Sequence, residues 1–253
     1  MFERREYKKS WQGRMEPFKM VGNIYFVGCF PASTHLIDTG DGLILIDPGY
    51  ISTLHLVIDG IYKLGFRPEQ IKYIINSHWH ADHIGGTAAL AHLTGAKTLL
   101  GRDDVEPAAD YFVPDILVKD GDTLTLGNTT VSFMETPGHT KGTISFFFDT
   151  KDGDKIYRVG SFGGAGINTL QQGEEEFPGA REAYRASLHR LRKEHVDVFM
   201  GNHVWNNNTL EHYNILKSTG ENKFIDDQLW ERFLVFCEKR LDETIARDVP
   251  EVG

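Results

Sequence analysis

The feature that most constrains the fold of this chain is Ser77–Gly86, where three histidines and an aspartate fall within six consecutive positions. This segment directly follows the apolar run Tyr73–Ile75, which predicts a short strand over residues 72–76. Imidazole nitrogens and carboxylate oxygens are the ligands that zinc accepts in proteins. The sequence therefore predicts metal ligands gathered at the carboxyl end of a strand. The plainer alternative is a histidine-rich surface loop.

The spacing within this segment favours two metal ions over one. His78 and His80 are two residues apart, so their side chains point to the same side of an extended chain. Asp82 and His83 follow after the chain has begun to turn, and we expect them to reach a second position. Two glycines then lead into a helix that we expect to open at Thr87.

Two further apolar runs end in loops that carry a histidine. Val131–Glu135 leads into a Thr-Pro-Gly-His-Thr segment that contains His139, and Val196–Met200 leads into a loop with His203. Three strand ends with such residues predict a rim of loops on one edge of a sheet, where binding groups tend to lie.

Together the three loops contain two ligand sets. The first is a three-histidine set with an open fourth position, as in catalytic zinc sites, and consists of His78, His80 and His139. The second consists of Asp82, His83 and His203. Two zinc ions that share a water lower its pKa toward ~7 and supply hydroxide at neutral pH. The pattern therefore predicts hydrolysis that needs no serine or cysteine nucleophile.

These motifs resemble the metallo-β-lactamase superfamily, which carries His-x-His-x-Asp-His and Thr-Pro-Gly-His-Thr. The early apolar strand Leu43–Ile46, followed by Asp47, also matches that superfamily. The match runs from Trp11 to the last helix. The resemblance implies a four-layer αβ/βα sandwich, of the α/β (α+β) class, with two Zn²⁺ per chain at one edge between its halves.

One residue indicates which branch of the superfamily this sequence resembles. It lies at the end of the strand expected over residues 155–159. Most branches of the superfamily place there an aspartate that bridges the metals, whereas this sequence has Ser161. The third metallo-β-lactamase subclass has a serine and binds its second zinc through Asp/His/His. This sequence is similar to that subclass, also over residues 16–28 and 177–188.

The same resemblance implies several contacts around the metals. Ser161 would hydrogen-bond the substrate or a water, and Gly163 stands where true lactamases of this subclass have a second serine that helps to hold the substrate carboxylate. Lys141 is a candidate for that anion contact, or else a solvated loop lysine. Asp47 either fixes a histidine ring or is a buried turn aspartate.

The function implied is that of a dinuclear zinc hydrolase that opens a β-lactam ring. In that mechanism His78 and His80 hold the metal that polarises the scissile carbonyl, while Asp82 is a ligand that also orients the hydroxide. The main alternative is a lactone or thioester hydrolase of the same superfamily. The retention of both ligand sets disfavours a metal-binding protein without activity. A diiron partner of a flavoprotein would need carboxylate-richer ligands and a flavodoxin domain.

We expect a single domain over residues 1–253, built from two similar halves at about 15–128 and 129–250. In the first half, apolar runs predict strands at 24–27, 35–37 and 43–46 and a helix at 54–64. In the second half, they predict strands at 129–135, 143–148 and 155–159 and helices at 178–194 and 226–247. Asp152-Gly153-Asp154 reads as a hairpin turn.

Composition limits the classes of molecule that this protein is expected to bind. A net charge of −9 disfavours nucleic acid, which needs a basic face, and no run of eighteen apolar residues predicts a membrane span. We expect a small-molecule substrate and favour a monomer, and the two cysteines, far apart in sequence, predict no disulfide. The first ten residues lack the apolar core of a signal peptide. We therefore expect a cytoplasmic protein if Met1 is the native start, and a periplasmic or secreted one if a signal has been removed.

Overall fold

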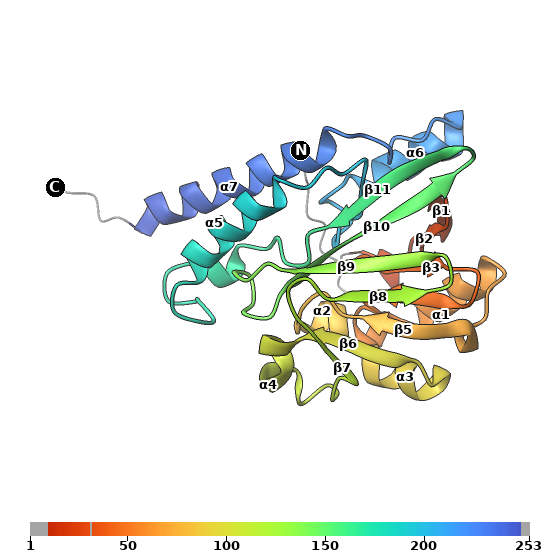
Figure 1. Ribbon diagram of the computed structural model, residues 1–253, viewed down its shortest axis with the longest axis horizontal. Coiled ribbons are helices and arrows are strands. Elements are labelled where there is room, and N and C mark those ends of the chain that lie inside the picture. The colour runs from red at the N-terminus through yellow and green to blue at the C-terminus, as the bar shows by residue number, and fades with distance from the viewer. Residues whose placement is uncertain (1–9, 31, 249–253) are drawn as a thin grey trace.

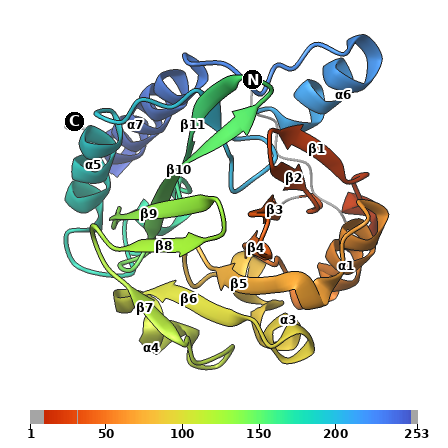
Figure 2. The same cartoon turned by 45° about the vertical axis from the view of Figure 1, so that its right-hand side comes forward.

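The computed structural model describes residues 10–30 and 32–248. Two β-sheets face each other and helices cover their outer sides (Figures 1 and 2). The prediction about cellular location rests on the first ten residues, and residues 1–9 lie outside the described part of the chain.

The first sheet has seven strands in chain order. Its first four strands are antiparallel neighbours and the remaining pairings are parallel. The strands are β1 Phe18–Val21, β2 Ile24–Phe26, β3 His35–Asp38, β4 Leu43–Ile46, β5 Ile71–Ile75, β6 Lys97–Gly101 and β7 Ile116–Val118. All four residues of β4 are buried, because a strand covered on both faces carries apolar side chains at every position.

The second sheet has five strands in the order β12-β11-β10-β9-β8. These are β8 Thr123–Leu126, β9 Thr129–Glu135, β10 Ile144–Asp152, β11 Lys155–Ser161 and β12 Val198–Phe199. Only the β11–β12 pair is parallel. Asp152 pairs with Lys155 across a two-residue turn, as predicted, in which Gly153 adopts a φ of +59° that suits glycine.

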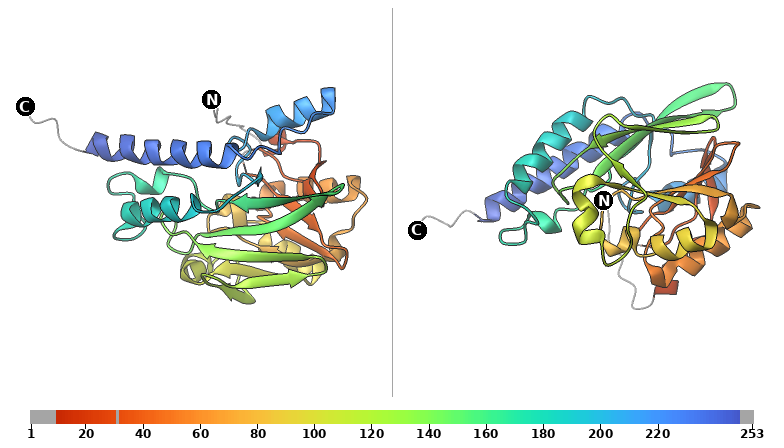
Figure 3. Two further views of the ribbon diagram at one scale, coloured as in Figure 1. Left: turned by 45° about the horizontal axis from the view of Figure 1, so that its top comes forward. Right: turned by 60° about the horizontal axis from the view of Figure 1, so that its bottom comes forward.

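Helices cover the outer face of each sheet. The α-helices are α1 Leu54–Lys63, α2 Ala81–Ile84, α3 Thr87–Thr94, α4 Val105–Ala108, α5 Ala180–Leu191, α6 Thr209–Thr219 and α7 Leu229–Asp248. Short 3₁₀ turns occupy Ser10–Gly13, Ile51–Thr53, Pro68–Gln70, Arg102–Asp104 and Asn168–Leu170. Helices α5 and α7 lie side by side over the second sheet (Figure 3).

Alternating side chains divide the core into three layers. In β4, Ile44 and Ile46 face the second sheet, while Leu45 packs with residues of α1 and α3. In β10, Phe146 packs between the sheets and Phe147 packs against α5 and α7. Helix, sheet, sheet and helix therefore form the four layers of the αβ/βα sandwich, which confirms the predicted fold class.

The change from one sheet to the other falls between Val118 and Thr123. The sequence predicts two halves that divide at about residue 128, but β8 pairs with β9 and belongs to the second sheet. The strand β8 alternates threonine and leucine, with Leu124 and Leu126 packed against the core, but β6 and β7 are short and lack such alternation. Strands β6 and β7 extend the sheet through their parallel pairing with β5 and with each other.

Backbone contacts bring the ends of the strands together at one edge. The N–H of Ile144 donates to the carbonyl of Ser77 (2.9 Å), which joins the loop after β5 to the second sheet. The N–H of Ser33 donates to the carbonyl of Asn202 (2.9 Å), which joins the loop after β12 to the first sheet. The loops that contain the predicted ligands therefore meet where the two sheets meet.

Candidate metal centre

The first predicted ligand set comes together at this edge. His78 and His80 lie in the loop after β5, and His139 lies in the loop between β9 and β10. One nitrogen from each ring lies within 4.8 Å of the others. Nδ1 of His80 and Nε2 of His139 are 3.0 Å apart. Such spacing suits three nitrogens that share one ion.

The second set lies beside the first. Asp82 and His83 are in the short helix α2, whereas His203 follows β12. Oδ2 of Asp82 is 3.4 Å from Nε2 of His83 and 3.7 Å from Nε2 of His203. The ring planes of His203 and Trp205 stack with centroids 4.5 Å apart, which fixes the histidine ring. Rings from both sets also touch, because His78 and His83 have centroids 4.1 Å apart.

The tight turn around α2 explains why His78 and His80 join one set while Asp82 and His83 join the other. His80 has an extended backbone and caps the helix, so the next turn places Asp82 and His83 on the other side. The carbonyl of Ala81 would lie 2.6 Å from a Cβ at position 85, so only glycine fits there. The N–H of Gly86 donates to the carbonyl of Gly49 (2.8 Å), which ties α2 to the end of β4.

Two buried nitrogens test whether this donor set suits a metal. Nε2 of His78 and Nε2 of His83 are buried and have no hydrogen-bond partner among the described residues. The other nitrogen of each ring is held, by Ser77 Oγ at 3.0 Å and by Asp47 Oδ2 at 2.8 Å. Buried polar atoms are seldom left without a partner. The donor atoms therefore fit metal ions, with the opposite nitrogen of each ring fixing its orientation.

Asp47 is the centre of a buried hydrogen-bond network. It accepts hydrogen bonds from the backbone N–H (2.7 Å) and the hydroxyl (2.7 Å) of Ser77, and it lies 2.8 Å from Nδ1 of His83. Its φ of +51° is uncommon for a residue with a side chain. The sequence left two interpretations of Asp47, a group that fixes a histidine ring or a buried turn aspartate. In the structure its carboxylate lies against the ring of His83.

Glu176, in the loop before α5, contacts the ring of His80 on the side away from the other ligands of the first set. The sequence did not predict this residue. Oε1 of Glu176 is 2.7 Å from Nε2 of His80, while Oε2 accepts a hydrogen bond from the indole N–H of Trp79 (3.0 Å). Thr169 Oγ1 similarly lies 3.2 Å from Nδ1 of His139. The available signal was the acidic run at residues 174–176, but no periodicity tells which glutamate faces a histidine.

The environment of the site favours the deprotonated forms of His78, His139 and Asp82, whereas His83 differs. Burial, followed by the neighbouring histidines, lowers the pKa of His78 and His139 well below the usual value. Burial opposes ionisation of Asp82, but His83 and His203 outweigh it and lower the pKa of Asp82. Burial also opposes a charged His83, yet the carboxylates of Asp82 and Asp47 raise its pKa. Neutral imidazoles and an ionised carboxylate are the forms that bind metal.

The three predicted substrate contacts do not line the pocket at this site. Ser161 is buried at the end of β11, and Gly163 is packed so tightly that a Cβ would lie 1.9 Å from the carbonyl of Ile144. Lys141 is exposed and reaches toward Asp103, 4.0 Å away. The structure therefore gives these positions no contact with the cavity.

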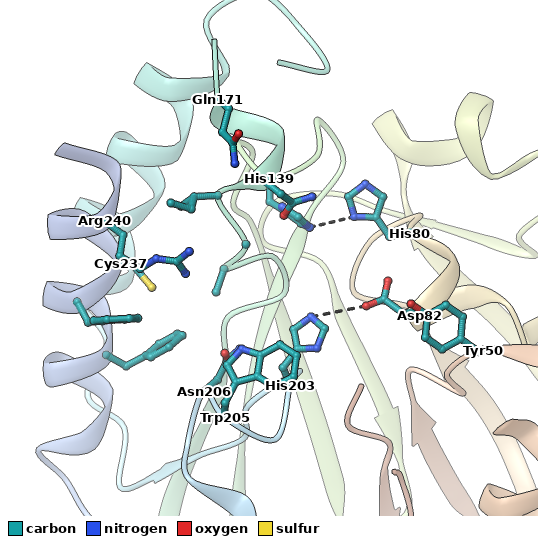
Figure 4. A pocket seen from close by; sticks show the side chains of 16 residues that line it. Tyr50, His80, Asp82, His139, Gln171, His203, Trp205, Asn206, Cys237 and Arg240 are labelled. Atoms are coloured by element: carbon teal, nitrogen blue, oxygen red, sulfur yellow. Dashed lines mark hydrogen bonds and ion pairs between the residues drawn. The ribbon is translucent and has the colours of Figure 1, made fainter. Parts of the chain in front are cut away.

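A pocket of about 790 Å³ opens over the candidate ligands (Figure 4). His80, Asp82, His139 and His203 form one side of it, and residues of α7, including Phe233, form another. Such a volume suits a drug-sized molecule. Both cysteines are free, and Cys237 lines the wall formed by α7.

Comparison with known proteins decides the family. The model of the metallo-beta-lactamase superfamily matches residues 27–203, which include all six candidate ligands. The chain belongs to the metallo-beta-lactamase superfamily.

Solved structures of subclass B3 metallo-β-lactamases are similar over nearly the whole chain. BJP-1 of Bradyrhizobium japonicum is 31% identical with a TM-score of 0.86, covering 94% of this chain and 97% of that one. FEZ-1 of Legionella gormanii is 26% identical with a TM-score of 0.88, covering 95% and 98%. The predicted similarity to the third subclass is confirmed.

Curated sequence relatives match a smaller part. A hydroxyacylglutathione hydrolase of Hyphomonas neptunium is 35% identical over 129 residues, which are 49% of this chain and 44% of the relative. The mitochondrial persulfide dioxygenase ETHE1 of Mus musculus is 30% identical over 135 residues, 51% and 48% of the two chains. The chain thus spans less than half the length of these relatives. Among the described residues, no helix has the length and apolar character needed to span a membrane.

Proposed function

We propose that this protein is a dinuclear zinc hydrolase that opens the amide bond of β-lactams. The observation that carries the proposal is the pair of adjacent ligand sets, three histidines beside Asp/His/His, at the side of one pocket. When bound, a pair of zinc ions supplies Lewis acidity toward a carbonyl and a water of lowered pKa. His78, His80 and His139 would hold one ion, and Asp82, His83 and His203 the other.

The chain's own residues prepare the site for hydrolysis. The ionised carboxylate of Asp82 lies between the two histidines of its set, where it can accept a hydrogen bond from an attacking water and orient it. Asp47 and Ser77 fix the rings of His83 and His78, so ordering these side chains costs little during the reaction. No serine is required as a nucleophile.

Two observations support a β-lactam as the substrate. The B3 enzymes resemble this chain over 94% and 95% of its length, and Ser161 stands at the end of β11, where other branches have a bridging aspartate. A thioester is the second candidate, favoured by the hydroxyacylglutathione hydrolases among the relatives. Gly163, which cannot carry a side chain that holds a carboxylate, also weakens the case for efficient β-lactam turnover.

Steady-state kinetics of zinc-loaded protein with a penicillin, a cephalosporin and a carbapenem, beside a lactone and a thioester panel, test the proposal. We expect chelator-sensitive β-lactam turnover with kcat/KM above roughly 10⁴ M⁻¹s⁻¹, the low end for a working enzyme. His139→Ala should abolish this turnover, whereas His195→Ala, on the exposed surface, should preserve it. Weak β-lactam turnover with strong thioester turnover would move the function to the second candidate.

A further inference from the structure

The wall of the pocket opposite His80 and Asp82 is formed by one face of α7. Phe233, Phe236, Cys237 and Arg240 all line the pocket, and their spacing places them on the same side of the helix. Figure 4 shows the guanidinium of Arg240 extending from α7 toward the interior of the pocket. The cavity therefore has the candidate metal ligands at one end and a cation at the other.

The arginines on the neighbouring helix form ion pairs, whereas Arg240 forms none with the described residues. Arg185 of α5 pairs with Asp242, and Arg192, just after α5, pairs with Glu238 at 2.7 Å. Among the described residues, Arg240 has no carboxylate within ion-pair distance and rests over the ring of Phe236, 5.6 Å from its centroid. An arginine held by a ring but without a counter-charge leaves its hydrogen-bond donors available to a ligand.

The other described residues that line the pocket supply no carboxylate to pair with Arg240. Asp82, the one carboxylate among the described lining residues, belongs to the ligand set. Burial raises the pKa of the Cys237 thiol to about 12, so this residue stays neutral. In a chain with a net charge of −9, a free arginine in the pocket is a local attraction for anions.

We propose that Arg240 binds a carboxylate on the part of the substrate that lies away from the bond being cleaved. Phe233 and Phe236, on the same wall of the pocket, pack against the apolar body of the substrate. Guanidinium groups bind carboxylates through paired hydrogen bonds, which gives the contact direction as well as charge. The proposal deepens the proposed function, on which it rests for the bond that is cleaved, by selecting substrates with an anionic side chain.

Benzylpenicillin and carbenicillin test this subsite because carbenicillin differs by one additional carboxylate on the acyl side chain. In zinc-loaded Arg240→Ala, we expect the KM for carbenicillin to rise about 10-fold, with kcat within twofold, because a charge-assisted hydrogen bond is lost. The KM for benzylpenicillin should stay within twofold. Lys239→Ala, on the exposed side of the same helix, is the matched control, and Arg240→Lys should retain part of the preference.

A second readout separates failure of this proposal from failure of the proposed function. If wild-type protein hydrolyses neither penicillin, the proposed function fails, and isothermal titration then gives the Kd of each compound for the same variants. The same 10-fold selective loss in Kd would support the subsite. Equal losses for both compounds would overturn it, since they would mean a packing role for Arg240 or contact with the ring carboxylate that both share. Unchanged carbenicillin affinity in Arg240→Ala would overturn it as well.

Discussion

The two candidate ligand sets are held in place by different parts of the chain. His83, in the Asp/His/His set, is fixed by Asp47, which follows a fully buried strand and is itself 1% exposed. His80, in the three-histidine set, is fixed by Glu176, whose side chain is 22% exposed in the loop before α5. We call Asp47 and Glu176 the two anchors. Asp47 belongs to the core of the first sheet, whereas Glu176 lies in a loop of the second half of the chain. Disturbing the first should therefore affect both folding and metal binding, and disturbing the second should affect metal binding alone.

The largest effect is expected from Asp47→Ala. Its removal leaves Ser77 and His83 without their shared acceptor inside the core, so the free energy of unfolding should fall by about 4 kcal/mol. Metal affinity of the Asp/His/His set should fall roughly 100-fold. Urea denaturation and metal titration measure the two effects. Asp38→Ala, which removes an exposed turn contact, is the control, and a variant as stable as wild type would contradict the core role of Asp47.

His35, on β3 of the first sheet, should make this region sensitive to acid. Burial, opposed by the charge of Asp47, lowers the pKa of His35 from 6.5 to about 4. Because the folded pKa is the lower one, the contribution to stability is present above pH 6.5 and is lost as the pH falls toward 4. Between pH 7.5 and 5, this amounts to about 2 kcal/mol.

Urea denaturation of chelator-treated protein at several pH values measures this contribution. The other buried histidines titrate in both proteins, so the difference between wild type and His35→Asn isolates His35. We expect the wild type to lose more stability on acidification than the variant does. Parallel pH profiles would show that His35 takes no part.

A smaller and more selective effect is expected from Glu176→Gln. Glutamine keeps the shape but loses the charge that orients His80, so the metal affinity of the three-histidine set should fall about 10-fold. The free energy of unfolding should be unchanged, because the loop is partly exposed. Cobalt titration, followed by the absorption of each site, compares the variant with Glu174→Gln, an exposed glutamate of the same loop. A loss shared equally by both ligand sets would remove the distinction between the two anchors.

The sequence by itself determined the family, the four layers and the six candidate ligands. The ligands and the family motifs depend on short stretches of sequence, because each ligand-bearing loop follows a strand whose buried apolar residues can be recognised; the four layers follow from the family resemblance. Asp47 belongs with them, since it directly follows β4.

Only the tertiary structure decided which other side chains reach the site. Glu176 and His80 are 96 positions apart, and no periodicity relates a loop glutamate to a histidine so distant. The anion contact shows the same limit: Lys141, next to a motif, reaches toward Asp103 outside the pocket, while Arg240 of the last helix extends into it. The physical reason is that the chemistry of a ligand restricts its residue type, whereas a partner is chosen by the packing of whole elements, here α7 and the loop before α5, against the edge where the sheets meet.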